Sequence, residues 1–255
     1  MARVVAVCNQ KGGVAKTTTC ISLGAALTEL GQRVLLVDGD PQGNLALSLG
    51  LAEGSAAEGK LGAAGEGAWK ERLLHPEAMP ALAVLAGGPR LALQGNDGRG
   101  NAWPAATVRA LRADFDWVLI DCPPSLGRLT LGPLEVADEV LVPVQCEFLA
   151  AQGLLQMMTI VEALQKRRKD PLVVRVLAVM FDRRKNLSRQ VLERYRAAFP
   201  EILCETVIGV DARLSECPIL GEPVTVYAPR SRGSQQYRAL AQEMLGLLQK
   251  GESPT

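Results

Sequence analysis

A glycine- and lysine-bearing stretch near the N-terminus has the residue types needed to hold a polyphosphate. The sequence KGGVAKTTT follows soon after the apolar run Val4–Val7. The adjacent glycines Gly12 and Gly13 allow a turn whose backbone N–H groups face a phosphate, and the next helix adds the positive end of its dipole. Lys16 places a positive charge near the β- and γ-phosphates, and Thr17 offers a hydroxyl to Mg²⁺. The stretch predicts a nucleotide phosphate site.

The spacing departs from the common phosphate-loop template, GxxxxGK[ST]. Gln10 and Ala15 occupy its two glycine positions, and an extra lysine, Lys11, precedes the glycines. The alternative is an ordinary strand-to-helix turn that is rich in glycine only for its geometry. A second lysine buried in such a turn would serve no packing purpose, so the spacing favours phosphate binding.

Acidic residues end two other apolar runs. Asp38 and Asp40 follow Val34–Val37, and Asp121 follows Trp117–Ile120. An acid beside the γ-phosphate can position the attacking water, and an aspartate at the second strand end can hold the Mg²⁺ shell through water. For Asp38 and Asp40 taken alone, a capped turn is the alternative interpretation.

The positioning elements alternate between apolar β-rich runs and helix-like segments. The expected strands are Val4–Val7, Val34–Val37, Leu82–Leu85, Trp117–Ile120, Val140–Val144, Val173–Met180 and Glu205–Ile208. This alternation predicts an α/β fold with a doubly wound, mainly parallel sheet flanked by helices. The first helix is expected to reach Leu30 and to stop at Gly31. Ligands of such sheets bind at the carboxyl ends of the strands, where the phosphate stretch and the acids lie.

Length and composition favour one domain, residues 1–250, with a short polar tail at 251–255. Glycine-rich stretches at 52–68 and 95–101 are expected to be connections. The 28 basic and 27 acidic residues give a net charge of +1, which neither demands nor excludes a nucleic-acid partner. Six scattered cysteines, a missing signal peptide and no apolar run of about 20 residues favour buried free thiols and a cytoplasmic location.

Three further features have plain structural interpretations. The apolar faces of the segments 150–165 and 234–249 indicate core packing, and His75 is expected on the surface. The basic cluster Lys166–Lys169 either meets the negative end of a helix dipole or contacts DNA. The short polar tail disfavours membrane binding.

Motifs along almost the whole chain resemble the ParA/Soj family of partitioning ATPases. The first is KGGxxK[ST] at Lys11–Thr17, the deviant Walker-A form of the phosphate loop. The others are DGDPQGN at 38–44, DCPPSLG at 121–127, VPVQCE at 142–147, the segments Met180–Asn186 and Arg213–Pro218, and PRSRG at 229–233. The resemblance implies a deviant Walker-A P-loop NTPase fold.

The resemblance also implies site residues. ATP and Mg²⁺ would lie in two composite sites of a nucleotide-sandwich homodimer. Lys11 would reach across to the partner's phosphates, Lys16 would hold phosphates in cis, and Asp40 would set the attacking water. Thr17, Asp38 and Asp121 would form the metal side. The cofactor-binding set would be Lys11, Gly12, Gly13, Val14, Ala15, Lys16, Thr17, Thr18, Met180, Asp182, Gly209 and Asp211.

For partners, the resemblance implies duplex DNA and a ParB-type centromere-binding protein. The ATP-bound dimer would bind DNA without sequence preference on the nucleoid, through Arg213, Arg230 and Arg232. The partner would stimulate an otherwise slow hydrolysis and release the dimer. The chain looks like the short form, without an N-terminal extension that could hold a helix-turn-helix.

Two departures and two alternatives accompany this hypothesis. Ala15 stands where many relatives have glycine, and a positive φ there would cost on the order of 1 kcal/mol. Gly209, Val210 and Asp211 replace the family's Pro-Arg-Asn, which removes a basic side chain and changes the residues expected beside the adenine. One alternative is a nucleotide-dependent scaffold for protein cargo or a MinD-like positioning ATPase. The other is a metabolic or redox enzyme on the same scaffold, although no second cysteine matches Cys122 for iron–sulfur ligation.

Overall fold

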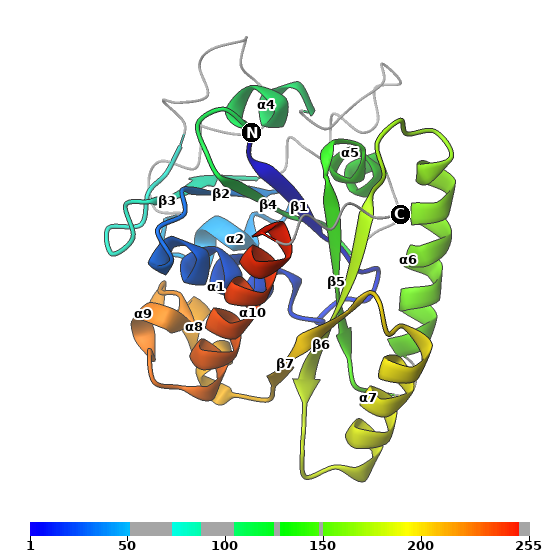
Figure 1. Cartoon of the computed structure of the whole chain (residues 1–255). Coiled ribbons are helices and arrows are strands. Elements are labelled where there is room, and N and C mark those ends of the chain that lie inside the picture. Colours follow the sequence, from blue (N-terminus) through cyan, green and yellow to red (C-terminus); the bar gives the residue numbers. More distant parts are fainter. Residues whose placement is uncertain (52–72, 88–104, 125–127, 148–149, 250–255) are drawn as a thin grey trace.

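The fold was analysed in a computed structural model that describes residues 1–51, 73–87, 105–124, 128–147 and 150–249. The expected connections at 52–68 and 95–101 and the tail at 251–255 lie outside these residues. Figure 1 shows a central twisted sheet with helices on both faces.

Seven strands form one sheet, in the order β3-β2-β4-β1-β5-β6-β7, and every pairing between them is parallel. The strands are β1 (Arg3–Val7), β2 (Val34–Asp38), β3 (Leu82–Leu85), β4 (Trp117–Asp121), β5 (Glu139–Gln145), β6 (Val173–Phe181) and β7 (Leu203–Gly209). An isolated antiparallel bridge joins Leu74 to Val84. The sheet confirms the predicted doubly wound, mainly parallel α/β fold.

The helices cover both faces of the sheet (Figure 1). They are α1 (Lys16–Glu29), α2 (Asn44–Leu47), α4 (Ala105–Leu111), α5 (Arg128–Val136), α6 (Ala150–Gln165), α7 (Asn186–Ala198), α8 (Ala212–Leu220), α9 (Val224–Tyr227) and α10 (Arg232–Gln249). Buried side chains of α4, α5, α6 and α7 pack in one apolar cluster, and those of α1 and α10 pack in a second. The strand residues divide between these clusters by alternation, which is why the runs are almost continuously apolar.

Three local expectations are confirmed, for the end of α1, the apolar face of α10 and the cysteines. The helix α1 ends at Glu29, and Gly31 follows with a φ of +79°. Tyr237, Leu240 and Met244 of α10 are buried, as core packing required. All six cysteines are free and buried. Within the described ranges, no helix is both long and apolar enough to cross a membrane.

The edge strand β7 is protected by side chains of α10. The carboxylate of Glu243 accepts hydrogen bonds from the N–H groups of Glu205 and Thr206, at 2.8 and 2.9 Å. Gln236 Oε1 accepts one from Gly209 N at 2.9 Å. An open edge would invite pairing with another chain, so these bonds stop the sheet at β7.

One member of the basic cluster after α6 has a structural role. The guanidinium of Arg168 donates to the carbonyl oxygens of Leu134 and Ala137, at 2.5 and 2.7 Å, where α5 ends. A cation at a helix C-terminus satisfies carbonyl groups that have no partner within the helix. For Arg168 the dipole interpretation therefore holds, although the helix it meets is α5 rather than α6.

Candidate nucleotide site

The phosphate loop joins β1 to α1 at the carboxyl edge of the sheet. Gly13 has a φ of +70°, and Ala15 adopts the left-handed region with φ 59° and ψ 31°. Thr19 N then donates to Ala15 O at 2.8 Å, which starts the helix. The positive φ expected at Ala15 is therefore present, with a backbone cost on the order of 1 kcal/mol. Left-handed residues in such a turn help to point successive N–H groups toward an anion.

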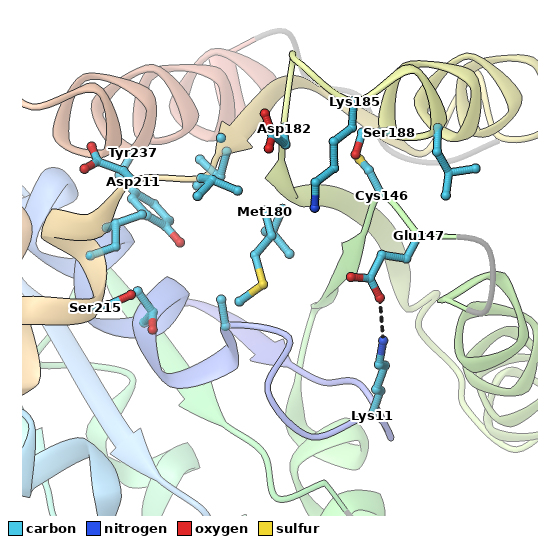
Figure 2. A pocket seen from close by; sticks show the side chains of 18 of the residues that line it. Lys11, Cys146, Glu147, Met180, Asp182, Lys185, Ser188, Asp211, Ser215 and Tyr237 are labelled. Carbon is cyan, nitrogen blue, oxygen red and sulfur yellow. Dashed lines mark hydrogen bonds and ion pairs between the residues drawn. The ribbon is translucent and has the colours of Figure 1, made fainter.

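The two lysines of the loop lie in different environments. Lys16 is 8% exposed, and its Nζ donates to the carbonyl oxygen of Lys11 at 3.2 Å. The Lys11 side chain is 40% exposed and turns back onto its own chain, where Nζ lies 3.2 Å from Glu147 Oε2 (Figure 2). The same Nζ lies 2.6 Å from Gln145 Oε1. In this structure the lysine expected to reach a partner is held at the end of β5.

Two amides that the sequence reasoning did not assign to the site fix the loop. Asn9 Oδ1 accepts from Lys11 N at 3.0 Å, while its Nδ2 donates to Pro143 O at 2.7 Å. Gln145 Nε2 donates to Gly13 O at 3.2 Å and lies 3.0 Å from the sulfur of Met180. Gln145 belongs to the VPVQCE motif, and Asn9 lies three residues before Gly12, so both positions were close to recognised motifs.

The predicted metal side is a buried acidic cluster at the ends of β2 and β4. Thr17 Oγ1 donates to Asp121 Oδ2 at 2.6 Å. The other oxygen, Asp121 Oδ1, is buried and has no hydrogen-bond partner among the described residues. Burial, reinforced by the negative charge of Asp38, raises the pKa of Asp121 to about 8. The water shell of a bound Mg²⁺ needs an anionic hydrogen-bond acceptor nearby. A buried carboxylate with an unsatisfied oxygen meets this need.

Asp38 supports the neighbouring turn. Its carboxylate accepts from Asp40 N at 3.1 Å and from Leu45 N at 3.0 Å, so it holds the start of α2. Burial raises the pKa of Asp38 to about 7 although these N–H groups oppose the shift. The capped turn considered for this sequence is therefore present, and the same turn places Asp40 at the carboxyl edge of the sheet.

Asp40 is half-buried, and one of its carboxylate oxygens is bound within its own turn. Oδ1 accepts from Gln42 N at 3.0 Å, whereas Oδ2 has no hydrogen bond within the described part of the chain. The loop after β3 presses against this turn, since a Cβ on Gly87 would lie 2.6 Å from Asp38 O and 2.8 Å from Asp40 O. Only glycine fits there without moving the turn that carries Asp40.

One cavity of about 840 Å³ joins the phosphate loop to the strand ends of β6 and β7. Seven of the predicted cofactor residues line it: Lys11, Ala15, Thr18, Met180, Asp182, Gly209 and Asp211. Figure 2 shows Lys11 on one side, Asp211 and Tyr237 on the other, and Met180 between them. The volume is within the range of sites for small ligands, about 300–1,000 Å³. Thr17 lines a separate, smaller cavity beside α2.

The resemblance implies that the adenine lies near Met180–Asp182 and 209–211, and the polar side chains at this end of the cavity are engaged by hydrogen bonds within the chain. Met180 adopts a left-handed conformation with φ 52° and stays 40% exposed. Asp182 is bound through both carboxylate oxygens by the guanidinium of Arg184, at 3.0 Å each. Asp211 accepts from Arg213 N at 3.0 Å and from Gly233 N at 2.7 Å. Asp211 therefore caps α8 and also ties it to the start of α10.

Gly209 makes room for one of the basic residues expected to bind DNA. A Cβ at this position would lie 3.3 Å from Cζ of Arg232. Its N–H is also the donor to Gln236, which proline in this position would lack. Arg213, Arg230 and Arg232 are all exposed, and they belong to the α8–α10 corner.

Comparison with known proteins agrees with this geometry. A family model described as an AAA domain matches residues 2–174. The chain is 39% identical to the sporulation initiation inhibitor protein Soj of Bacillus subtilis, over 96% of this chain and 98% of that protein. It is 41% identical to the chromosome partitioning protein ParA of Caulobacter vibrioides, over 95% and 94%. The chain belongs to the ParA/Soj family of chromosome-partitioning ATPases.

A solved structure supports the cofactors of this ParA/Soj chain. Cobyrinic acid a,c-diamide synthase from Mycobacterium smegmatis, crystallised with an ATP analogue and magnesium, is 34% identical, covers 99% of this chain and 98% of its own, and has a TM-score of 0.72. The chain is an ATPase, and its phosphate loop and buried acids fit ATP and Mg²⁺.

We expect Asp121→Asn to stabilise the nucleotide-free ParA/Soj chain at pH 8. The raised pKa means that, between about pH 4 and pH 8, the folded protein keeps a proton that the unfolded chain has already released. The free energy of unfolding therefore falls as pH rises through this window, and asparagine removes that loss. Thermal melts should place the variant on the order of 10 °C above the parent at pH 8, with little difference at pH 4.5.

Asp116→Asn is the matched control for this prediction. Its pKa is lowered by hydrogen bonds from Arg33 at the opposite edge of the sheet, so this substitution should not stabilise the chain at pH 8. Mg-ATP should raise the melting temperature of the parent and fail to raise that of Asp121→Asn. If Asp121→Asn melts below the parent at pH 8, the interpretation that the buried Asp121 carboxylate destabilises the nucleotide-free chain is wrong.

Proposed function

We propose that this chain drives DNA segregation by switching between an ATP-bound dimer on duplex DNA and a released form. The dimer binds duplex DNA on the nucleoid without sequence preference, in the cytoplasm, and a ParB-type partner stimulates the hydrolysis that releases it. One observation supports the coupling of nucleotide to DNA. Asp211 lines the nucleotide cavity and also binds the N-termini of α8 and α10, which carry Arg213 and Arg232.

The roles proposed for the site follow from its geometry. The N–H groups of the loop from Gly12 to Thr18 and the ammonium of Lys16 hold the phosphates. Thr17 and Asp121 face the metal side, Asp38 keeps the turn in place, and Asp40 orients the attacking water through its free oxygen. When bound, Mg-ATP supplies the transferable phosphoryl group and the cation that spreads its charge.

Lys11 is suited to exchange between its own chain and a second copy. Both partners of its ion pair with Glu147 are exposed to solvent, with 40% of the Lys11 side chain and 63% of the Glu147 side chain accessible. Exposed pairs contribute about 0–1 kcal/mol, so leaving Glu147 costs little. The move also breaks the hydrogen bond to Gln145 Oε1, which the partner's phosphates would replace. We propose that the lysine exchanges this contact for the partner's phosphates in the ATP-bound dimer.

A salt-titrated DNA-binding measurement tests the proposed function. A dimer that uses Arg213, Arg230 and Arg232 from each copy would neutralise six phosphates. Counterion release then predicts that affinity for a random duplex falls by about 10³-fold between 50 and 200 mM salt. We expect this binding with ATP and not with ADP or without nucleotide, for example by fluorescence anisotropy.

Other outcomes of the binding measurement would contradict this proposal or favour one of the alternative functions. Binding that is independent of ATP, or none at 50 mM salt, would contradict the segregation proposal. ATP-dependent dimerisation without duplex binding would favour the scaffold for a protein cargo. Binding to anionic lipid vesicles with ATP would favour the MinD-like alternative.

A further inference from the structure

Arg213 is held in one orientation by two side chains of the α8–α9 corner. Its Nη1 donates to Glu216 Oε2 at 2.9 Å and to the hydroxyl oxygen of Tyr227 at 2.8 Å. The guanidinium carbon lies 5.7 Å from the centre of the Tyr227 ring, within the range of a cation–π contact. The Tyr227 hydroxyl in turn donates to Glu216 Oε2 at 2.6 Å. The three side chains form a closed set of hydrogen bonds.

This set leaves one edge of the guanidinium free. Both contacts use Nη1, so Nε and Nη2 have no acceptor among the residues that the structure describes. The Arg213 side chain is 54% exposed. Two adjacent N–H groups in one plane match two oxygens of a phosphate, a geometry that lysine cannot offer.

The backbone on both sides of this set is also fixed. Asp211 accepts from Arg213 N and from Gly233 N, which ties the start of α8 to the start of α10. Tyr227 ends α9, and Ser231 N donates to Ala228 O at 2.9 Å in the loop that follows. The Arg213 side chain is therefore attached to a corner whose own geometry is set by hydrogen bonds.

We propose that Tyr227 and Glu216 are positioning residues that present the Nε–Nη2 edge of Arg213 to a single phosphate of duplex DNA. The inference rests on the proposed function and adds the means by which the arginine is aimed. Holding a long side chain in its bound orientation removes part of the entropy lost on binding. The Tyr227 hydroxyl and Arg213 both donate to Glu216 Oε2, so this carboxylate is held within the set.

The protonation states agree with these contacts. Hydrogen bonds from Tyr227 and Arg213 lower the pKa of Glu216, and the bond to Glu216 raises the pKa of Tyr227. Glu216 is thus a carboxylate and Tyr227 a neutral hydroxyl at neutral pH, as the donor and acceptor roles require.

A double-mutant cycle on duplex affinity tests the inference with the full chain and ATP. Tyr227→Phe keeps the ring and the charge and removes the hydroxyl, and we expect affinity to fall about 2- to 10-fold, the range for freeing one long side chain. Arg213→Ala should lose about tenfold or more. The double variant should bind as Arg213→Ala does, because Tyr227 acts only through Arg213. Losses that multiply, or an unaffected Tyr227→Phe, would overturn the proposal.

Arg213→Lys covers the case in which Tyr227→Phe does not fold. This variant keeps the positive charge, so the dependence of duplex affinity on salt concentration should stay that of the parent. Affinity itself should fall about 2- to 10-fold, because lysine lacks two adjacent N–H groups in one plane. A lysine variant that binds like the parent would overturn the proposal.

Arg33→Ala is the control for loss of a surface arginine. Arg33 is paired with Asp116 before β2, at the amino edge of the sheet, and its removal should leave duplex affinity unchanged. If the parent and Arg33→Ala both fail to bind duplex with ATP, the proposed function falls and this inference with it. If both bind and Tyr227→Phe binds equally well, only the positioning inference falls.

Discussion

Lys16→Ala is expected to weaken ATP binding by about 100-fold or more. Lys16 is the buried cation of the loop, 8% exposed, and its Nζ donates to the Lys11 carbonyl oxygen inside the turn. A charged hydrogen bond in a site shielded from water contributes about 1.5–3 kcal/mol, and an unpaired phosphate charge left behind adds to the loss. The substitution also removes the cation that lowers the pKa of Asp121. Both effects act against a bound triphosphate and its metal.

Calorimetry with Mg-ATP measures this effect, and Lys166→Ala is its control. Lys166 is an exposed lysine directly after α6, so its loss should leave nucleotide affinity within about twofold. The duplex binding that depends on ATP should disappear with Lys16→Ala. An affinity for ATP within threefold of the parent would contradict the role given to Lys16.

The strands could be predicted because a strand that is buried on both faces is almost continuously apolar in sequence. The predicted and observed bounds of β1, β2, β4 and β5 differ by one residue or less at each end. The start of β7 was placed two residues late, at Glu205 rather than Leu203. There the strand is at the sheet edge, and its register with β6 is irregular, so the apolar pattern is weaker.

The side-chain contacts of the site were much harder to predict from the sequence. Lys11 and Gln145 are 134 residues apart, and nothing in the local pattern of either predicts that their side chains meet. Asp211 and Gly233 are likewise brought together only because α8, α9 and the loop after α9 return the chain to the start of α8. Composition and periodicity specify which face of an element is buried, whereas pairs of polar side chains depend on the packing of elements far apart in the chain.

Three features that weaken the fold lie at the nucleotide site. Ala15 and Met180 are the non-glycine residues with positive φ in the described chain, and Asp121 keeps a buried oxygen without a partner there. Each costs stability in the nucleotide-free protein. Such costs are typical of sites whose binding partner supplies the missing interactions. The positive φ at Ala15 was the one such feature that the sequence reasoning had considered.

Asp40→Ala is expected to lower ATP hydrolysis by about 100-fold or more while ATP still binds. The free Oδ2 of Asp40 faces no donor in the described chain, and a positioned acid or base of this kind contributes about 10²- to 10⁴-fold. Lys16, the loop N–H groups and the acids Asp38 and Asp121 stay in place, so ground-state affinity should change little. Since release from DNA requires hydrolysis in the proposed cycle, the variant should remain on duplex after ATP is added.

Asp40→Asn separates the water-positioning role from the turn. The amide oxygen can still accept the hydrogen bond from Gln42 N, so the turn keeps its geometry, but the negative charge is lost. Phosphate release and duplex retention, measured with and without excess competitor DNA, should match those of Asp40→Ala. An asparagine variant that hydrolyses ATP like the parent would mean that Asp40 acts only by shaping the turn. If both variants lose ATP hydrolysis equally, the effect comes from the carboxylate charge. The reason is that Asp40→Asn keeps the hydrogen bond from Gln42 N, whereas Asp40→Ala loses it.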